Sequence, residues 1–259
     1  MKKYGNCHLC GEYKKLSFEH VPPKKAFNDK PAIYTEIEKM IDKDPRNIRE
    51  GEISQKGVGG HTLCEKCNND TGSWYGNAFV EWVYQGLTIL HKTERQPTLY
   101  YPFHIFPLRI IKQIICMFFS VNGPDFCKRE PELVRFVLNR EEKHLNPKIR
   151  IYAFYTASSY SRQVGWGSWV TYNYKSGKGP YMFGEITFSP FGYIMSLDSK
   201  PHDSRLYDIS FFADYSYNDW KSISLRLPVL PVDSCFPGDY RSNEEIQKAF
   251  ERNINMSKA

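Results

Sequence analysis

The sequence lacks any segment that would span a membrane. No stretch approaches the run of about 18 consecutive apolar residues that a transmembrane helix requires. The first residues, Met1 to Cys7, contain no apolar core of the kind found in secretory signal peptides. We therefore expect a cytoplasmic protein without a membrane partner. In that compartment the seven cysteines are expected to be metal ligands, catalytic groups or core residues.

A strong charge of either sign is also missing. The sequence has 35 lysines and arginines against 29 aspartates and glutamates, which leaves a net charge of +6 over 259 residues. This charge permits a nucleic-acid partner but does not require one. The sequence also lacks internal repeats and low-complexity tracts, so we expect one large domain or two small ones.

The hydrophobic pattern predicts an α+β protein in two parts. Residues 1–96 are predicted to form a small zinc-stabilised module: short strands around a turn, a long polar connection with a helix near 34–42, and a helix from about Asn68. The prolines at 97, 102 and 107 mark a break. Residues 97–259 are predicted to be an α+β accessory domain with mostly antiparallel sheet, which would serve specificity, partner binding or homo-oligomer formation.

The elements of this second part follow from periodicity and turn residues. The predicted helices span 109–120, 132–138 and 243–252. The predicted strands span 149–155, 169–172, 181–188 and 209–217. Aromatic residues make up 15% of the chain, which is typical of packed β structure or of stacking surfaces.

Four of the cysteines form two CxxC pairs, Cys7 with Cys10 and Cys64 with Cys67. Each pair can place two thiolates on one tight turn, and two such turns complete the tetrahedron that Zn²⁺ prefers. We interpret them as a structural zinc site that supplies folding energy to a module with little core. The long connection between the pairs leaves open that one pair is redox-active or incidental.

Each cysteine pair is followed by polar residues that could form a catalytic site. Glu19 and His20 stand before Val21-Pro22-Pro23, and Asn68 comes directly after the last cysteine. The combined pattern resembles the HNH endonucleases, the ββα-metal nucleases, over about residues 4–85. Many of that family carry a two-CxxC zinc site and place an acidic residue and a histidine before a hydrophobic-x-Pro segment. They also place His or Asn directly after the last zinc cysteine.

The resemblance implies a hydrolase that cuts phosphodiester bonds of DNA, with RNA as the second candidate. His20 would activate water, since an imidazole with a pKa of about 6.5 can accept its proton. Glu19 and Asn68 would hold Mg²⁺ or Mn²⁺, because these cations prefer oxygen ligands. HNH modules are commonly fused to specificity domains in restriction and phage-defence systems, so we expect a role of that kind.

Two positions depart from the family pattern. Gly59 stands where the family usually has an asparagine that holds the loop orienting the catalytic histidine, and Thr71 stands where a lysine is frequent. His61 is the nearest polar substitute, and it is predicted to orient His20 or to be an extra metal ligand. The lysines that flank the motif are predicted to contact phosphates: Lys14, Lys15, Lys24 and Lys25.

The same residues permit a second interpretation, which is a zinc-stabilised module that binds nucleic acid or protein without catalysis. Glu19 would then be a solvated acid or an ion-pair partner, and His20 would pack against the zinc site. Asn68 would be the N-cap of the following helix, or Asn69 would take its place as a ligand. A thiol oxidoreductase that uses one CxxC pair is the third interpretation, and it requires two cysteines without metal.

Overall fold

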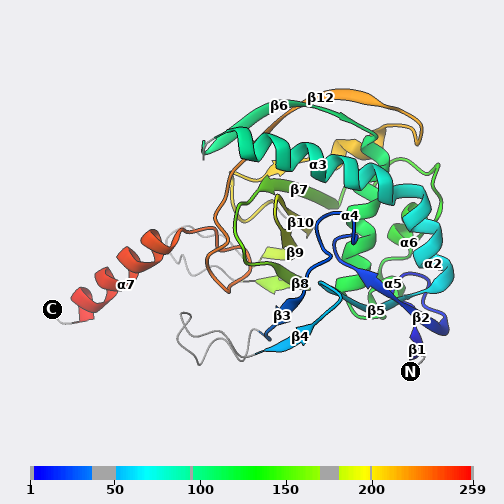
Figure 1. The fold of residues 1–259 in the computed structure, drawn as a ribbon, viewed down its shortest axis with the longest axis horizontal. Coiled ribbons are helices and arrows are strands. Elements are labelled where there is room, and N and C mark those ends of the chain that lie inside the picture. The colour runs from blue at the N-terminus through cyan, green and yellow to red at the C-terminus, as the bar shows by residue number, and fades with distance from the viewer. Residues whose placement is uncertain (1–2, 37–50, 94–95, 170–180, 199, 258–259) are drawn as a thin grey trace.

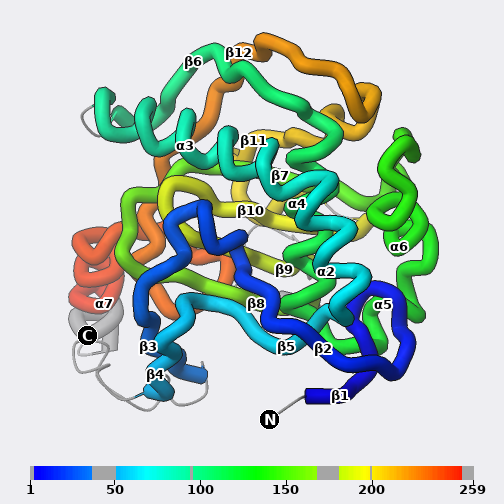
Figure 2. The backbone as a smooth tube through the Cα atoms, turned by 45° about the vertical axis from the view of Figure 1, so that its right-hand side comes forward, coloured from blue at the N-terminus to red at the C-terminus, as the bar shows by residue number. Residues whose placement is uncertain are grey.

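The computed structural model describes residues 3–36, 51–93, 96–169, 181–198 and 200–257. It is a mixed α+β protein with antiparallel sheets, as predicted (Figure 1). Both views place the N-terminal strand β1 at one end of the molecule and the ribbon of β6 and β12 at the other (Figures 1 and 2). No helix among these residues is long and apolar enough to cross a lipid bilayer.

The N-terminal part is built on a three-stranded antiparallel sheet. Its strands lie in the order β1 (Lys3–Asn6), β2 (Tyr13–His20) and β5 (Gly59–Cys64). The register places His20 opposite Gly59. The connection between β2 and β5 includes a two-stranded hairpin of β3 (Ala32–Tyr34) and β4 (Glu52–Ser54). The predicted helix near 34–42 falls on Tyr34 of β3, then on Thr35 and Glu36, which form no helix, and otherwise outside the described residues.

A long helical segment follows β5 without a break. It consists of α2 (Glu65–Thr71), a π-helix (Gly72–Gly76) and α3 (Asn77–Lys92), which confirms the predicted helix and extends it toward the N-terminus. Phe79, Trp82 and Val83 of α3 are buried, as their helical spacing predicted. A single π-turn inside an α-helix is a feature often found at functional sites.

The centre of the molecule is α4 (Pro107–Val121), whose predicted range of 109–120 is confirmed. Nearly every residue of α4 is buried, because the helix packs against the π-helix, α3 and α6. Proline at the first helical position starts it without the loss of a hydrogen bond. The short helices α5 (Phe126–Arg129) and α6 (Pro131–Leu138) follow, and the second confirms the helix predicted over 132–138.

The larger sheet has five antiparallel strands. Their spatial order is β11 (Tyr207–Asp208), β7 (Ile149–Tyr155), β10 (Phe191–Leu197), β9 (Tyr181–Phe188) and β8 (Arg162–Trp169). The strands predicted over 149–155 and 181–188 are confirmed. The predicted strand over 169–172 shares only Trp169 with β8, and its other residues lie outside the described ones. The predicted C-terminal helix is confirmed as α7 (Asn243–Ser257), which extends away from the body (Figure 1).

The strand predicted over 209–217 is wrong. β11 ends at Asp208, and Ser210–Asp214 forms a 3₁₀ helix. Ile209, Phe212 and Ala213 are buried together and pack beside α4, so their spacing is helical and not alternating.

The proline-containing stretch after residue 96 contains a strand that the sequence did not predict. Thr98–Ile105 forms β6, which pairs with β12 (Lys221–Pro228) in a separate two-stranded ribbon. One hydrophobic cluster includes residues from both sides of the predicted boundary, among them Leu63 and Ile114. The division into domains 1–96 and 97–259 stays a prediction.

Candidate functional site

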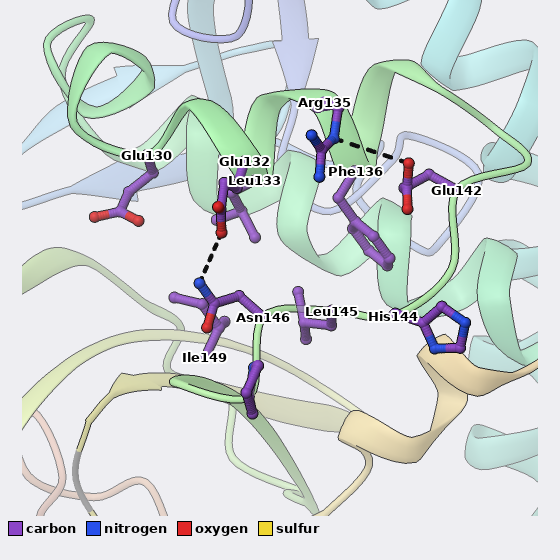
Figure 3. Close-up of a pocket in the computed structure, with 11 residues that line it drawn as sticks. Glu130, Glu132, Leu133, Arg135, Phe136, Glu142, His144, Leu145, Asn146 and Ile149 are labelled. Atoms are coloured by element: carbon purple, nitrogen blue, oxygen red, sulfur yellow. Dashed lines mark hydrogen bonds and ion pairs between the residues drawn. The ribbon is translucent and has the colours of Figure 1, made fainter.

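We consider two pockets as candidate sites, and in one of them two of the lining carboxylates have partners in the protein. This pocket, of about 230 Å³, lies beside α6 (Figure 3). Asn146 donates a hydrogen bond of 2.8 Å to Glu132, and Arg135 forms an ion pair of 3.8 Å with Glu142. The residues of the predicted motif line the second pocket instead, near the cysteine pairs.

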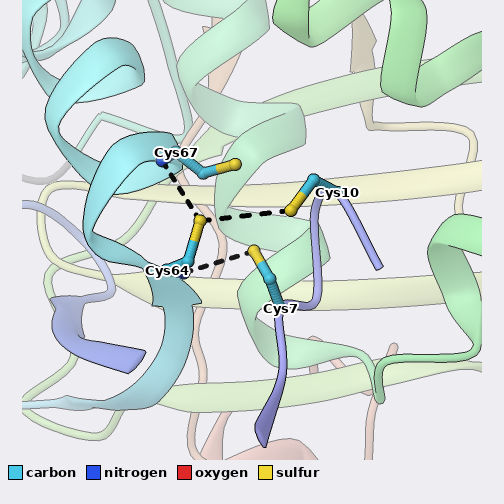
Figure 4. A group of neighbouring side chains, drawn as sticks. All are labelled: Cys7, Cys10, Cys64 and Cys67. Atoms are coloured by element: carbon cyan, nitrogen blue, oxygen red, sulfur yellow. Dashed lines mark hydrogen bonds between the residues drawn. The ribbon is translucent and has the colours of Figure 1, made fainter. Parts of the chain in front are cut away.

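The four cysteines predicted to bind zinc lie together. Cys7 and Cys10 occupy the turn after β1, while Cys64 and Cys67 lie at the start of α2 (Figure 4). Their Sγ atoms all lie within 4.8 Å of one another. The Cys10 and Cys64 sulfurs are 4.0 Å apart, close to the edge of about 3.8 Å expected for a tetrahedron with Zn–S bonds of about 2.3 Å. The cluster can therefore hold a metal ion such as zinc.

Hydrogen bonds stabilise the thiolate form of Cys7 in this cluster, whereas burial raises the pKa of Cys10. The backbone N–H of Cys64 donates to the Cys7 sulfur at 3.2 Å, and that of Cys67 donates to the Cys64 sulfur at 3.5 Å. A hydrogen bond from the Cys67 thiol lowers the pKa of Cys7. A zinc ion bound by all four cysteines would have a complete tetrahedron and no open position for catalysis.

The cysteine turn is fixed to the C-terminal end of α4. The Nδ1 atom of His8 lies 3.3 Å from the backbone oxygen of Ser120. Gly11 lies against α5, where an added Cβ would be 3.2 Å from the Cys127 sulfur. Cys116 is fully buried in α4, as expected for a core cysteine. The cysteine cluster thus connects the N-terminal sheet to the helices of the second part.

The second pocket, of about 360 Å³, lies between the end of β2 and the α2–α3 segment. Its lining includes several of the predicted site residues: Glu19, His20, Lys24, Lys25 and Asn68. Asn69 is not part of this lining. The fold therefore brings the acidic residue, the histidine and the asparagine of the motif to one cavity.

Glu19 is the most unusual group in this pocket. Its side chain is only 7% exposed, and it forms no hydrogen bond or ion pair with any residue that the structure describes. Burial raises the pKa of Glu19 to about 8. An ionised carboxylate in such a place is unfavourable unless a positive charge compensates it. Glu19 is therefore neither the solvated acid nor the ion-pair partner of the non-catalytic interpretation.

Asn68 also lines this pocket. It lies within α2, whose N-cap is Cys64, so Asn68 is not the cap of this helix. Its Nδ2 donates hydrogen bonds to the Ser17 hydroxyl at 3.0 Å and to the Phe18 backbone oxygen at 3.4 Å. These bonds fix the amide, and no donor among the described residues contacts Oδ1. An amide oxygen beside a buried carboxylate is a donor set that suits Mg²⁺ or Mn²⁺.

The tautomer of His20 follows from its backbone contact. Its Nε2 lies 2.8 Å from the carbonyl oxygen of Lys56. A carbonyl can only accept, so Nε2 carries the hydrogen and a neutral ring keeps Nδ1 unprotonated. Burial, followed by the charges of Lys24 and Lys56, lowers the pKa of His20. The imidazole is therefore suited to accept a proton at neutral pH.

The loop that supplies the Lys56 carbonyl is held by Asn28. Buried Asn28 donates hydrogen bonds of 2.7 Å to the carbonyls of Pro22 and Val58, and its Oδ1 accepts one of 2.7 Å from the Val58 N–H. Gly57 has φ +83°, and an added Cβ would lie 2.5 Å from the Asn28 backbone oxygen. The loop before β5 is thus fixed against the turn that follows His20.

Gly59 has no space for the asparagine of the family pattern. A Cβ at this position would lie 2.1 Å from the backbone oxygen of Glu19, because the two strands approach closely there. The hydroxyl of Tyr34 contacts the Gly59 backbone instead. The group that contacts His20 comes from the Lys56 backbone, which sequence reasoning missed. The glycines around Val58 indicated a tight loop, but not which carbonyl it would present.

Three predicted residues lie outside the pocket lining. His61 is paired with Phe18 across the sheet, and the two rings meet edge to face at 5.4 Å. Lys14 and Lys15 form ion pairs with Glu12 and Glu65. Their predicted roles in orientation and phosphate contact stay predictions.

No family model, curated protein or solved structure matches this chain. The HNH resemblance therefore stays a prediction, and the functional argument rests on the geometry of the pocket. That geometry combines an uncompensated buried carboxylate, a fixed amide oxygen and a neutral imidazole, with Lys24 and Lys25 at the same cavity. Such a set can bind a divalent cation, accept a proton and attract an anionic substrate.

Proposed function

We propose that this protein is a metal-dependent endonuclease of the HNH type that hydrolyses phosphodiester bonds of DNA. The observation that carries the proposal is Glu19, a buried carboxylate without a partner among the described residues, in the same pocket as His20 and Asn68. A folded protein tolerates such a group when the site serves a ligand, and a divalent cation is the ligand that this donor set suits.

The local fold supports this assignment. β2 and β5 are antiparallel neighbours, and α2 begins directly after β5, which is the strand–strand–helix order of a ββα-metal module. Glu19 and His20 lie at the end of the first strand, and Asn68 lies on the helix. The four cysteines lie at the turn after β1 and at the junction of β5 and α2, so zinc would serve structure and a second cation would serve catalysis.

The proposed chemistry assigns one role to each group. Glu19 and the Asn68 oxygen would hold Mg²⁺ or Mn²⁺. A cation bound there supplies positive charge that stabilises the developing charge on the leaving oxygen. His20 accepts the proton of the attacking water at Nδ1, while its Nε2–H stays hydrogen-bonded to Lys56 and so stabilises the imidazolium. Lys24 and Lys25 contact the substrate phosphates.

The second part of the chain, residues 97–259, would select the substrate, bind a partner protein or form a homo-oligomer. A role in restriction or phage defence is consistent with a nuclease of this architecture. By analogy with the family, the products would carry 3′-hydroxyl and 5′-phosphate ends.

The proposal is tested by incubating the zinc-loaded protein with Mg²⁺ or Mn²⁺ and a panel of substrates: supercoiled plasmid, linear duplex, single-stranded DNA and RNA. We expect cleavage of DNA that stops when the divalent cation is removed. Cleavage of RNA alone would correct the substrate class. If no member of the panel is cut, although the protein is folded and contains zinc, the chain is instead a binding module.

A further inference from the structure

Gln113 lies in the same pocket but far from the motif in sequence. It belongs to the middle of α4, and its side chain is only 2% exposed. Its Oε1 atom is buried and has no hydrogen-bond partner among the described residues. An amide oxygen buried without a donor is unfavourable by about 1–3 kcal/mol, so a native protein that keeps one in a pocket calls for a ligand that supplies the donor.

The pocket leaves space for such a ligand because two positions of its helical wall are glycines, which carry no side chain. Gly72 and Gly76 of the π-helix both line it, and a Cβ added to either would meet no heavy atom within 4 Å. The π-helix is also a main packing partner of α4. Each glycine lowers the stability of the helix by about 1 kcal/mol relative to alanine. A ligand that needs the space beside Gly72 and Gly76 would explain why glycine stands at both positions.

We propose that Gln113 is part of the divalent-cation site, where its Oε1 accepts a hydrogen bond from a water molecule bound to the cation. The inference rests on the proposed function, because Glu19 and Asn68 are taken as the groups that hold the cation. Mg²⁺ and Mn²⁺ retain several bound waters in protein sites, and such waters are strong donors that match an unpaired amide oxygen. The site is then completed by α4, outside the segment that resembles HNH nucleases.

The test is Mn²⁺ binding to the full zinc-loaded chain without substrate, measured by the electron paramagnetic resonance signal of free Mn²⁺. Gln113→Leu keeps the buried volume and removes the amide. We expect its Mn²⁺ affinity to fall by about 10–100-fold, which is the usual effect of losing a group that hydrogen-bonds to a metal's ligands. The matched control is Ser120→Ala, since the Ser120 hydroxyl is also a buried unpaired group on α4 but lies outside this pocket. Its Mn²⁺ affinity should equal that of the parent.

The possible outcomes separate this inference from the proposed function. If the parent binds Mn²⁺, Glu19→Gln does not, and Gln113→Leu binds as tightly as the parent, then the role of Gln113 is wrong and the metal site stands. If the parent binds Mn²⁺ no better than Glu19→Gln, both the role of Gln113 and the proposed metal site are wrong. Gln113→Glu covers the case in which the leucine variant does not fold. It should bind Mn²⁺ at least as tightly as the parent, because it keeps an acceptor and adds negative charge, and weaker binding would overturn the inference.

Discussion

The Nε2 atom of His20 lies 2.8 Å from the backbone oxygen of Lys56. This contact assigns the ring hydrogen to Nε2 and leaves Nδ1 of the neutral ring free to accept a proton. In the family pattern an asparagine holds the loop that orients the histidine. In this protein the corresponding position is Gly59, which cannot carry a side chain, and the orienting contact comes from a loop held by Asn28. The proposed mechanism depends on this loop.

Replacing Asn28 should therefore weaken both the fold and the reaction. Asn28→Ala removes three buried hydrogen bonds, each of which contributes about 1 kcal/mol. We expect a loss of about 3 kcal/mol in unfolding free energy, measured by urea denaturation, and slower plasmid cleavage under conditions where the variant is fully folded. Asn146→Ala is the control, since its two side-chain hydrogen bonds, to Glu132 and from the Lys148 N–H, are both exposed. Parent-like cleavage by folded Asn28→Ala would show that the loop does not orient His20.

The positive charge of Lys56 should contribute to the acidic limit of activity. Burial and the charges of Lys24 and Lys56 lower the pKa of His20. Removing the Lys56 charge in Lys56→Gln raises this pKa, and the imidazole is then protonated at a higher pH. Since the protonated ring cannot accept a proton, the acidic limb of the pH–rate profile should move to higher pH. Lys128→Gln, at an exposed ion pair with Asp125, should leave the limb in place. A shift to lower pH would contradict the assignment of His20 as base.

Glu19 should reduce stability in the absence of a divalent cation. Its pKa rises from about 4.5 unfolded to about 8 folded, so stability is highest below pH 4.5 and falls as the pH rises toward 8. Above pH 8 the loss is complete and is on the order of 5 kcal/mol. Glu19→Gln should therefore raise the thermal midpoint of the zinc-loaded, magnesium-free protein at pH 8. The same substitution should raise the midpoint much less at pH 4.5.

Addition of Mg²⁺ should stabilise the parent and leave Glu19→Gln unchanged, because only the parent keeps the carboxylate that holds the cation. A midpoint difference between the two proteins that does not vary with pH would contradict the buried, uncompensated state of Glu19.

The four cysteines should hold one zinc ion per chain, and its removal should affect more than the N-terminal sheet. The cysteine turn contacts Ser120 at the end of α4, so loss of zinc should loosen the docking of the two parts. Cys10→Ser should lower zinc content, measured by mass spectrometry of the metal, and lower the thermal midpoint. Cys235→Ser should change neither, since Cys235 lies outside the cluster. A parent with two unmetallated cluster cysteines would favour the thiol oxidoreductase interpretation.

The sequence was informative where chemistry is carried by adjacent residues. The CxxC pairs and the Glu19-His20 step could be recognised directly, and the fold places them as one cluster and one pocket. Asn28 and Gln113 could not be found in this way, since only tertiary packing brings them to the site. The Lys56 carbonyl carries no sequence signal at all, because every residue has one. The strand predicted over 209–217 was wrong because the buried residues of this segment have helical spacing, and Ser210–Asp214 forms a 3₁₀ helix.

The most direct test of the central claim is cleavage of supercoiled plasmid by the zinc-loaded parent and by His20→Ala in Mg²⁺, with His91→Ala as a control on an exposed histidine of α3. The account predicts that the parent and His91→Ala convert the plasmid to nicked or linear form. His20→Ala should bind the plasmid equally well and cut it at least about 100-fold more slowly. Equal binding without cleavage by any of the three proteins, or equal cleavage by His20→Ala, would contradict it.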